Sequence, residues 1–554
     1  MKTKRIKQLA AMLCAASLLL SACGEQKVSE EESVKLDNNV TEAGQLPVVK
    51  EPITLTVGIQ SSSKVKDFAT NEFTKYLTEK TGINLEFYEF PASGGMEKLN
   101  VMLASNSDLP DIICGFDISR TTFLEYADKN VFVDLAPYMD EYGYWIKEMS
   151  EKTKVKNFDS FLTAANGKKY FMPNVVEQTG NMYGGKAFIN KKWLDKLGLE
   201  MPETTEDFEK VMMAFVTQDP NGNGKNDEIG FTGSKDGWNE KPSNFLMNSF
   251  VFDDYRDGFV VDKDNKITVN YMSDKYKEGL TYLSKLAEEK ALDLQCFTQS
   301  TSTLRSLCSS DEEVIGAFAS GSPDVLFSDN PERLSDFVAL PPLKGPDGTA
   351  YAYKSEFTVA CGGVVTKFCE HPAAAFRLLD FMLSEEASLF GRYGVKDVDW
   401  KEVDESTPAL FESIGAKSRI MPILAYGAIQ NSHWNQFNPS FRSLDISDTQ
   451  AWDGNPLNGE YFKAQALYAY IGKGPENTFT RTRMSLGLDE MNEFGELYNS
   501  ISAYVKENIS LFVSGDKNLD GDWTEFQQSL ENLNVARYLE LAQQGYEAFL
   551  TQDQ

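Results

Sequence analysis

A strand, a helix and a second strand open the folded part of this 554-residue chain. Apolar and polar residues alternate in Ile53–Gln60 and again in Ile83–Phe90, which predicts two strands. The stretch 66–81 between them has the apolar spacing of an amphipathic helix. Strands joined through a helix usually lie parallel in one sheet. The pattern therefore predicts an α/β fold in which helices cover a largely parallel sheet.

The first 22 residues have the pattern of a secretory signal, with four basic residues ahead of an apolar run at 9–20 that is too short to span a bilayer. Cys23 follows small residues at 21 and 22, which resembles the lipobox of bacterial lipoproteins, where the thiol is diacylated, for example with palmitate. Two acyl chains give a stable membrane anchor. We expect a body lipid-anchored through Cys23 on the outer face of the cell membrane; the alternative is an ordinary signal in which Cys23 is incidental.

The composition of the chain argues against some classes of binding partner. The formal net charge of -29 argues against nucleic acid and anionic lipid, because both would be repelled. The length exceeds what one hydrophobic core usually occupies, so two lobes are expected. Aromatic residues make up 12% of the chain, which leaves rings available for stacking on a ligand. No apolar run after the anchor is long enough for a transmembrane helix.

Five cysteines follow the signal and the anchor, and none has a neighbour at CxxC spacing. We expect mostly buried free thiols. The alternative is one bridge, either Cys296 to Cys308 or Cys361 to Cys369.

Several stretches, taken in their order, resemble the extracellular solute-binding proteins that serve carbohydrate-type ABC importers, including alginate- and oligosaccharide-binding receptors. They are 103–112 (LASNSDLPDI), 131–138 (VFVDLAPY), 188–198 (FINKKWLDKLG), 340–348 (LPPLKGPDG) and 370–382 (EHPAAAFRLLDFM). The resemblance runs from about Ile53 to the end of the chain. It implies a type II periplasmic-binding-protein-like α/β fold, in which each of two lobes is a sheet flanked by helices and hinge strands join the lobes.

The resemblance also implies how the chain is divided and what it does. A ligand is expected between the lobes, at the carboxyl ends of parallel strands. We expect a monomer that captures an extracellular solute, by resemblance an oligosaccharide, closes on it, and delivers it to an ABC permease. The expected parts are a signal peptide (1–22), a solvated lipidated tether (23–52), lobe one (53–185 plus 360–410) and lobe two (186–359 plus 411–554).

One loop has the residues of a calcium site. Oxygen-bearing side chains recur as in the first half of an EF-hand loop, with a glycine at position six and a main-chain carbonyl at position seven. Position twelve is Gly230, so Glu228 would have to complete the shell. The alternative is a solvated Asn/Gly turn without metal. The candidate ligands of this structural Ca²⁺ are Asp219, Asn221, Asn223, Lys225 through its carbonyl, Asp227 and Glu228.

A second stretch, Asp516 to Asp522, has similar spacing. Here a metal is the alternative, because Asp522 as a helix N-cap with Glu525 three residues later explains the sequence without one.

Sugars bind on aromatic rings and need partners for their hydroxyls. Three tryptophans lie in polar, turn-rich sequence and are the candidate platforms, although a tryptophan is more often a core residue. Polar or stacking groups near the expected hinges are further candidates. The candidate ligand-binding residues are Trp238, Trp434 and Trp452, with Tyr183, Asp117, Ser62 and Glu356.

Two other functions remain open. The chain has no HExxH, GxSxG or P-loop motif, but a glycoside hydrolase needs only two well-placed carboxylates. A sensor or adhesion lipoprotein could use the same two-lobed body without transport. We expect a binding protein with no catalytic residues, and the sequence does not name its sugar.

Overall fold

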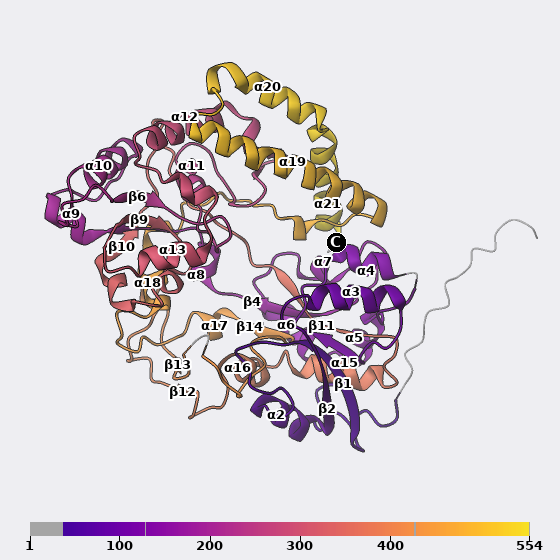
Figure 1. The fold of residues 1–554 in the computed structure, drawn as a ribbon. Coiled ribbons are helices and arrows are strands. Elements are labelled where there is room, and N and C mark those ends of the chain that lie inside the picture. Colours follow the sequence, from indigo (N-terminus) through magenta and orange to yellow (C-terminus); the bar gives the residue numbers. More distant parts are fainter. Residues whose placement is uncertain (1–36, 128, 426–427, 553–554) are drawn as a thin grey trace, which may run out of the picture. The chain divides into compact units, whose positions relative to one another are not determined.

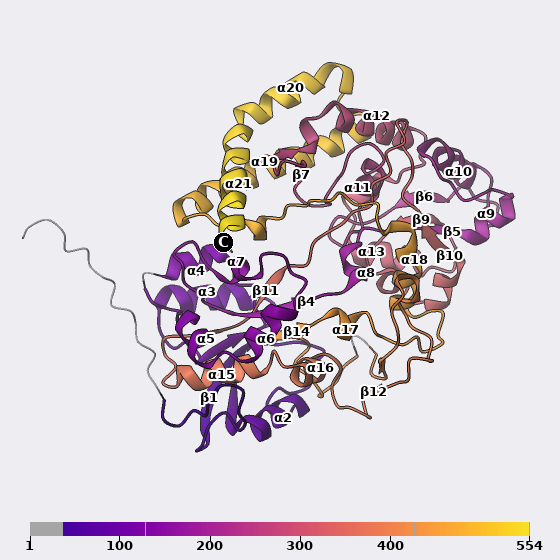
Figure 2. The ribbon, with the colours of Figure 1, turned by 180° about the vertical axis from the view of Figure 1, so that it is seen from behind.

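A computed structural model describes residues 37–127, 129–425 and 428–552. The predicted signal and Cys23 lie outside these described residues. Residues from Asn38 onward form one compact unit, drawn as a ribbon in Figure 1 and from behind in Figure 2. None of the helices in the described ranges is long and apolar enough to cross a bilayer.

The larger of two main sheets has six strands in the order β14-β4-β11-β3-β1-β2. β1 and β2 pair in parallel along their whole length, as the alternating sequence predicts. Only β11 runs antiparallel to its neighbours, so the other five strands point the same way. The strands are β1 (Ile53–Gln60), β2 (Ile83–Phe90), β3 (Ile112–Cys114), β4 (Met172–Val176), β11 (Val359–Val365) and β14 (Ser440–Arg442).

The second sheet has four strands in the order β10-β5-β9-β6. β6 and β9 are parallel, and β5 runs antiparallel to both β9 and β10. All five residues of β9 are buried, which is expected of a central strand with both faces covered. The strands are β5 (Ala187–Asn190), β6 (Ile229–Thr232), β9 (Ile315–Ala319) and β10 (Phe337–Leu340).

The chain passes between the two sheets at their carboxyl edges. It leaves β4 at Val176, runs through α8 (Thr179–Met182) and enters β5 at Ala187. It returns from the end of β10 to the start of β11. Because β5 and β11 oppose their neighbours, each begins at the edge where the other strands of its sheet end. These two connections, 177–186 and 341–358, are called the crossing segments below.

Residues 440–442 lie in the first lobe and not in the predicted second lobe. Residues 440–442 were placed with the second lobe, but β14 pairs in parallel with β4 in the six-stranded sheet. A strand of three residues among turns has too short a pattern to be assigned from sequence.

Helices surround both sheets (Figures 1 and 2). Those that precede the first crossing, or that lie between β11 and residue 458, are α2 (Glu72–Thr81), α3 (Gly95–Ser105), α4 (Arg120–Ala127), α5 (Ala136–Tyr142), α6 (Trp145–Lys152), α7 (Phe158–Leu162), α15 (Pro372–Phe381), α16 (Glu385–Tyr393) and α17 (Leu444–Ser447). Those near the four-stranded sheet are α9 (Lys191–Leu197), α10 (Thr205–Thr217), α11 (Pro242–Met247), α12 (Asp274–Glu288), α13 (Thr301–Cys308), α14 (Pro323–Leu326) and α18 (Gly459–Tyr470).

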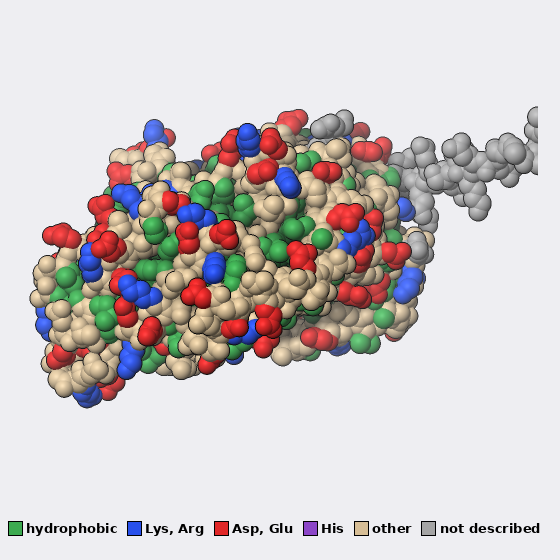
Figure 3. Space-filling view, turned by 90° about the horizontal axis from the view of Figure 1, so that it is seen from above, with side chains coloured by type: hydrophobic (Ala, Val, Ile, Leu, Met, Phe, Trp, Pro, Cys, Tyr) green, Lys and Arg blue, Asp and Glu red, His purple; other side chains and the backbone are tan. Residues whose placement is uncertain are grey.

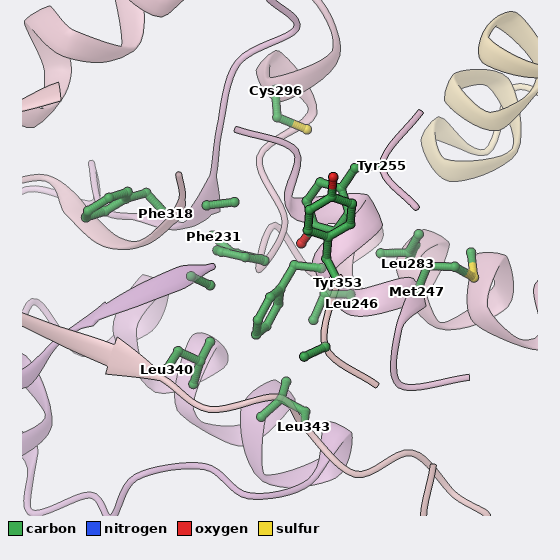
Figure 4. Packing of buried hydrophobic residues seen from close by; sticks show 14 of the residues in the cluster. Phe231, Leu246, Met247, Tyr255, Leu283, Cys296, Phe318, Leu340, Leu343 and Tyr353 are labelled. Atoms are coloured by element: carbon green, nitrogen blue, oxygen red, sulfur yellow. The ribbon is translucent and has the colours of Figure 1, made fainter. Parts of the chain in front are cut away.

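The chain ends in three helices, α19 (Leu488–Ser514), α20 (Leu519–Asn532) and α21 (Val535–Thr551), drawn in yellow in Figure 1. α19 packs along α12, and residues of all three belong to the same apolar core as the four-stranded sheet. Figure 4 shows part of that core. Smaller elements are two hairpins, β7–β8 (Phe259–Val261 and Ile267–Val269) and β12–β13 (Trp400–Glu402 and Ile420–Pro422), and 3₁₀ turns at Asn270–Met272, Leu294–Phe297, Pro331–Asp336, Glu412–Ile414 and Arg481–Arg483.

Capping fixes where several helices begin. α2 starts at Glu72, later than the predicted 66, because the side chain of Asn71 accepts a hydrogen bond from the Phe73 amide. α10 starts at Thr205 behind a capping box formed by Thr204 and Asp207.

The expected tether is shorter than predicted. Val48 and Val49 are buried, and the buried guanidinium of Arg377 donates to the carbonyl oxygens of Thr41 and Glu42 at 2.7 and 2.6 Å. Residues 38–50 therefore pack on the first lobe. The expectation of a solvated tether up to residue 52 is wrong for this part, because a buried arginine far along the chain supplies the hydrogen bonds that order it.

All five cysteines of the described ranges are free thiols, and all but Cys361 are buried. This confirms the expectation of buried free thiols over either bridge. On the surface, Figure 3 shows acidic side chains spread over one face with basic ones among them.

Candidate functional site

Trp238 lies at the edge of the four-stranded sheet, beside a crossing segment. Its ring is 43% exposed. A Cβ added at Gly321 would lie 2.4 Å from Trp238 Cε3, and one added at Gly184 would lie 3.0 Å from Trp238 Cζ2. The indole therefore rests directly on main chain that has no side chain beneath it. This leaves ring surface open to solvent, which is the arrangement that an aromatic platform for a sugar requires.

The loop that carries Trp238 is fixed by buried hydrogen bonds. Glu240 is buried, and its Oε2 accepts from the hydroxyls of Ser234 at 2.5 Å and Thr301 at 3.1 Å. Burial raises the pKa of Glu240, while these two hydroxyls oppose the shift. The Gly321 amide donates to the Trp238 carbonyl at 2.9 Å. The ring is thus held in place by the residues around it.

Two other predicted residues lie on the crossing segments. Tyr183 is buried, and its hydroxyl accepts a hydrogen bond from the Gly472 amide at 3.2 Å. Glu356 lies on the return crossing and pairs with Lys156, with 3.1 Å between Nζ and Oε1. Tyr183 immediately precedes Gly184, so the structure brings it close to Trp238. Because the Tyr183 ring is buried, it stabilises the crossing segment and does not present an open face to a ligand.

Ser62 and Asp117 follow β1 and β3, at the carboxyl edge of the six-stranded sheet. Ser62 Oγ accepts from the Asn435 amide at 3.5 Å and from the Lys64 amide at 3.2 Å. Asp117 is exposed. A Cβ at nearby Gly115 would lie 2.9 Å from Phe437 Cβ, so the 435–437 turn covers this edge. Both side chains lie at the carboxyl edge of the sheet, which is where the strand order predicts that a ligand binds.

Trp434 is a core residue. It is 0% exposed, and its ring meets those of Phe73 and Phe87 edge to face, each at a centroid distance of 5.3 Å. Its Nε1 donates to Thr74 Oγ1 at 2.8 Å. No ring face is left for a ligand, so the expectation of a sugar platform at Trp434 is corrected. The polar sequence around Trp434 suggested an exposed ring, but the residues that bury it lie more than 300 positions away in the chain.

Trp452 is half-buried. Its ring stacks on Tyr461 at a centroid distance of 4.7 Å, and Nε1 donates to the Asn455 carbonyl at 3.2 Å. One face is therefore covered by a neighbouring ring. Of the three predicted tryptophans, Trp238 is the one with open surface at a sheet edge.

The predicted calcium loop lies just before β6 and folds around its own side chains. Asp219 accepts from the Gly222 and Gly224 amides at 2.9 and 3.1 Å. The side-chain amides of Asn221 and Asn223 donate to Asp227 Oδ1 at 3.2 and 3.1 Å. Because an amide oxygen and nitrogen exchange by a half turn, the same side chains can present oxygen instead.

Glu228 has no partner for its charge in this loop. Both carboxylate oxygens are buried without a hydrogen bond. Burial raises its pKa, and the negative charges of Asp219 and Asp227 raise it further. A buried, unpaired carboxylate beside two others fits a site for a hard cation. Within the described ranges, no three His, Cys, Asp or Glu side chains are already gathered as metal ligands.

The second stretch is a helix cap. Asn518 Oδ1 accepts from the Asp520 and Gly521 amides at 2.7 and 3.3 Å, and Asp522 Oδ2 accepts from the Asn518 amide at 2.8 Å. These bonds use the oxygens that a cation would need. They cap α20 as the sequence predicts, with Asn518 as the N-cap in place of Asp522.

The profile of the bacterial extracellular solute-binding protein family matches residues 59–388. This match covers more than half of the chain. The chain belongs to this family.

Two characterised relatives of this solute-binding protein are similar over much of its length. The fructooligosaccharide ABC transporter substrate-binding protein FusA of Streptococcus pneumoniae serotype 4 (strain TIGR4) is 24% identical over 559 residues, which is 99% of each chain. The polygalacturonan/rhamnogalacturonan-binding protein YtcQ of Bacillus subtilis (strain 168) is 22% identical over 380 residues, 66% of this chain and 71% of that one.

Solved structures show the fold. FusA of S. pneumoniae in complex with kestose aligns with a TM-score of 0.70 and 22% identity, covering 90% of this chain and 100% of that one. An extracellular solute-binding protein of Bifidobacterium longum subsp. infantis aligns at 0.74 and 19%, covering 90% and 99%. The alginate-binding protein AlgQ2 without calcium ion aligns at 0.66 and 19%, covering 92% and 100%. The predicted two-lobed, periplasmic-binding-protein-like α/β fold is confirmed.

Sequence reasoning missed the glycines that seat Trp238. Gly184 and Gly321 lie about 140 residues apart along the chain and meet only at the indole. The Gly184-Gly185 pair was the one available signal, because it stands where the chain leaves the first lobe. Sequence reasoning also missed Ser234, Glu240 and Thr301, whose hydrogen bonds fix the loop that carries Trp238.

Proposed function

We propose that this solute-binding protein captures an oligosaccharide outside the cell and delivers it to the permease of an ABC importer. The observation that carries the proposal is the open indole of Trp238, seated on Gly184 and Gly321 beside a crossing segment. A sugar ring stacks its apolar face on such a surface. The name of FusA gives a fructooligosaccharide and an ABC transporter, and the name of YtcQ gives polygalacturonan and rhamnogalacturonan, which supports a carbohydrate as the solute and an importer as the partner.

The two lobes would share the ligand. Trp238 presents the platform of the second lobe, while Ser62 and Asp117 lie at the ligand edge of the first. A solute that contacts both sets favours the closed arrangement, because only that arrangement makes all the contacts. The crossing segments, including Tyr183 and Glu356, are the hinge in this proposal, and the lobe boundaries are those given from the sequence with β14 moved to the first lobe.

We infer a structural Ca²⁺ in the loop 219–228. Its ligands would be side-chain oxygens of Asp219, Asn221, Asn223, Asp227 and Glu228 with the carbonyl of Lys225. The unpaired Glu228 carboxylate supports this, because a divalent cation would neutralise it. One solved FusA structure is that of an EF-hand mutant, and an EF-hand in that relative supports the inference. The ion's contribution is to stabilise the loop, and it takes no part in chemistry.

The remaining parts of the proposal follow the sequence. Cys23 carries the lipid anchor, the protein acts as a monomer on the outer face of the membrane, and it has no catalytic residues. The characterised relatives are binding proteins, which supports a receptor over a glycoside hydrolase. No observation favours the sensor or adhesion alternative.

Ligand-dependent thermal unfolding tests the proposal. The full chain is unfolded in calcium with a panel of neutral and acidic oligosaccharides, and the glycan is then recovered. At a hundred times the dissociation constant, binding adds about 2.7 kcal/mol to the free energy of unfolding. We expect one glycan class to raise the unfolding temperature and to be recovered intact.

Trp238→Ala is the matched variant. It should keep the unfolding temperature of the free protein and lower the affinity at least tenfold, because the platform is removed and little buried area is lost. Gly321→Ala should weaken binding in the same way by displacing the ring. Cleaved glycan would point to a hydrolase, and unchanged affinity in Trp238→Ala would overturn the platform.

A further inference from the structure

The first crossing segment is fixed to the first lobe at its start. The Glu177 amide donates to the Arg442 carbonyl of β14 at 2.8 Å. Thr179 donates from its amide and its hydroxyl to the two carboxylate oxygens of Asp448, at 3.0 and 2.5 Å. Asp448 directly follows α17, which packs on β14. Residues 177–179 therefore belong to the first lobe.

The end of the same segment is fixed to the second lobe. The Lys186 carbonyl accepts from the amide of Ser320, which follows β9, at 3.0 Å. The Ala187 amide donates to the hydroxyl of Tyr470, in α18, at 3.1 Å, and that hydroxyl donates to the Leu340 carbonyl at 2.5 Å. One tyrosine thus holds β5 and β10 together, the two strands at which the crossing segments meet this lobe.

The return crossing is held by the second lobe as far as Ser355. The Ala352 amide donates to the carbonyl of Lys473, three residues after α18, at 3.1 Å. The Ser355 amide donates to the Met182 carbonyl at 2.8 Å, which joins the two crossing segments to each other. Residues 356–358 then lead into β11 of the first lobe.

Two short stretches lie between these fixed points. They are residues 180–182 in the first crossing and residues 356–358 in the return, and together they are called the pivot below. Any turn of one lobe against the other falls on the backbone between the parts that each lobe holds, since packed elements move as rigid bodies.

The side chain of Lys186 reaches across the first of these stretches. It is 0% exposed, and its Nζ donates to the carbonyl oxygen of Gly180 at 3.2 Å and to that of Tyr183. The backbone of Lys186 is held by the second lobe, whereas Gly180 directly follows the part that the first lobe holds. A turn at 180–182 would therefore separate Nζ from the Gly180 oxygen and leave buried polar groups unpaired, which costs free energy.

Lys186 can hold both carbonyl oxygens whether or not it is charged. Burial lowers the pKa of Lys186 to about 7; the positive charge of Lys463 in α18 lowers it further, and the negative charge of Glu460 in the same helix raises it. Lys463 and Glu460 also pair with each other. The ammonium group has three N–H donors and the neutral amine has two, which is enough for the two carbonyl oxygens.

We propose that the lobes turn against each other at the pivot, and that the buried side chain of Lys186 clamps it in the orientation seen in the structure. The inference rests on the proposed function, because closure on a ligand is the motion that the clamp restrains. It adds to that function the place where the chain bends and the side chain that resists the bend.

Interlobe distances in the ligand-free full chain test the proposal. Spin labels are carried on unnatural amino acids at positions 75 and 210, because Lys75 of α2 and Lys210 of α10 are exposed. Double electron–electron resonance then gives the distribution of distances between the labels. Lys186→Met removes the N–H donors and keeps an unbranched side chain of similar length. Tyr470→Phe is the matched control, because the hydrogen bonds that it loses lie within the second lobe.

Lys186→Met should broaden the distance distribution about twofold, because the clamped orientation is no longer favoured over its neighbours. Tyr470→Phe should lower the unfolding temperature and leave the width unchanged. Should Lys186→Met fail to fold, Lys186→Gln takes its place with the same expectation, since its shorter side chain loses at least one of the two contacts.

Two glycine variants test the pivot separately from the clamp. Asn181 and Gln178 are both half-buried, and glycine adds backbone freedom at either position. Asn181 lies within the pivot, whereas Gln178 lies between two residues that the first lobe holds. Asn181→Gly should therefore broaden the distribution, and Gln178→Gly should not.

Each part of the proposal has its own contrary result. An unchanged width in the Lys186 variant, or equal broadening in Tyr470→Phe, would overturn the clamp. Equal widths in the two glycine variants would overturn the pivot. None of these measurements needs a ligand, so failure of every oligosaccharide to bind would overturn the proposed function alone, and the distances would still decide on the pivot and the clamp.

Discussion

Two tryptophans in similar polar sequence have opposite roles, and the difference lies in what each ring touches. Trp434 is enclosed by Phe73 and Phe87 and donates to Thr74. Trp238 rests on two glycines and stays open. The first contributes to stability through buried area and a satisfied N–H. The Trp238 ring buries less area and so contributes less to stability, and its open surface is free to stack on a ligand.

Trp434→Ala should therefore destabilise the protein. Truncating a fully buried tryptophan costs about 3–5 kcal/mol, from lost transfer free energy and the cavity left behind. Urea unfolding followed by circular dichroism measures the change in the free energy of unfolding. Trp238→Ala is the control and should change it by less than about 1 kcal/mol. A loss below about 1 kcal/mol in Trp434→Ala would contradict its place in the core.

At the scale of the element, the loop before β6 joins helix α10 to the second sheet and carries three carboxylates within ten residues, Asp219, Asp227 and Glu228. Burial and the charges of Asp219 and Asp227 raise the pKa of Glu228. Between the unfolded and the raised folded pKa, the folded state binds more protons. Without a cation, its stability then falls as pH rises through that interval.

Calcium should reverse this trend. A divalent cation binds the ionised carboxylates, so millimolar Ca²⁺ should raise the unfolding temperature at pH 7 and have a smaller effect at pH 4.5, which is close to the ordinary pKa of a glutamate carboxyl. Differential scanning calorimetry with Ca²⁺ and with a chelator measures both shifts. Glu228→Gln should reduce the shift at pH 7, while Asp522→Asn, in the α20 cap, should leave it unchanged. An equal calcium shift at both pH values would count against the site.

At the scale of the whole molecule, the lobes also touch away from the crossing segments. Arg120 of α4 donates from Nη1 to the Met484 carbonyl, just ahead of α19, at 2.9 Å. Its Nη2 donates to the carbonyl oxygens of Ser160 and Phe161 at 2.6 and 2.8 Å. Phe161 of α7 meets Phe549 of α21 edge to face at 4.8 Å. One buried guanidinium thus ties the first lobe to the C-terminal helices that pack on the second.

Arg120→Ala should favour separation of the lobes. Burial lowers the pKa of Arg120 to about 10, so it is charged at neutral pH, and its charge-assisted bonds are lost in the variant. Small-angle scattering of the ligand-free protein should show a larger radius of gyration, and affinity for the glycan should fall several-fold because closure costs more. Lys129→Ala, an exposed change nearby, is the control. An unchanged radius of gyration would show that this contact does not hold the lobes.

The sequence by itself determined the elements whose pattern is local. Alternation in 53–60 and 83–90, the apolar spacing around them and the order of the family motifs predicted parallel strands and two lobes. The turn at 219–227 and a helix start near 516–522 could also be read from the sequence, because side chains there bond to their own backbone, although the N-cap of α20 is Asn518 and not the predicted Asp522. Buried free thiols followed from cysteine spacing.

Only the tertiary structure decided which side chains are open. Burial depends on contacts between residues hundreds of positions apart, and no local pattern contains them. Thr74 closes over Trp434, Gly184 and Gly321 seat Trp238, and Arg377 orders residues 38–50. The sequence thus indicated the kind of protein, while long-range packing decided which of the three tryptophans stays exposed.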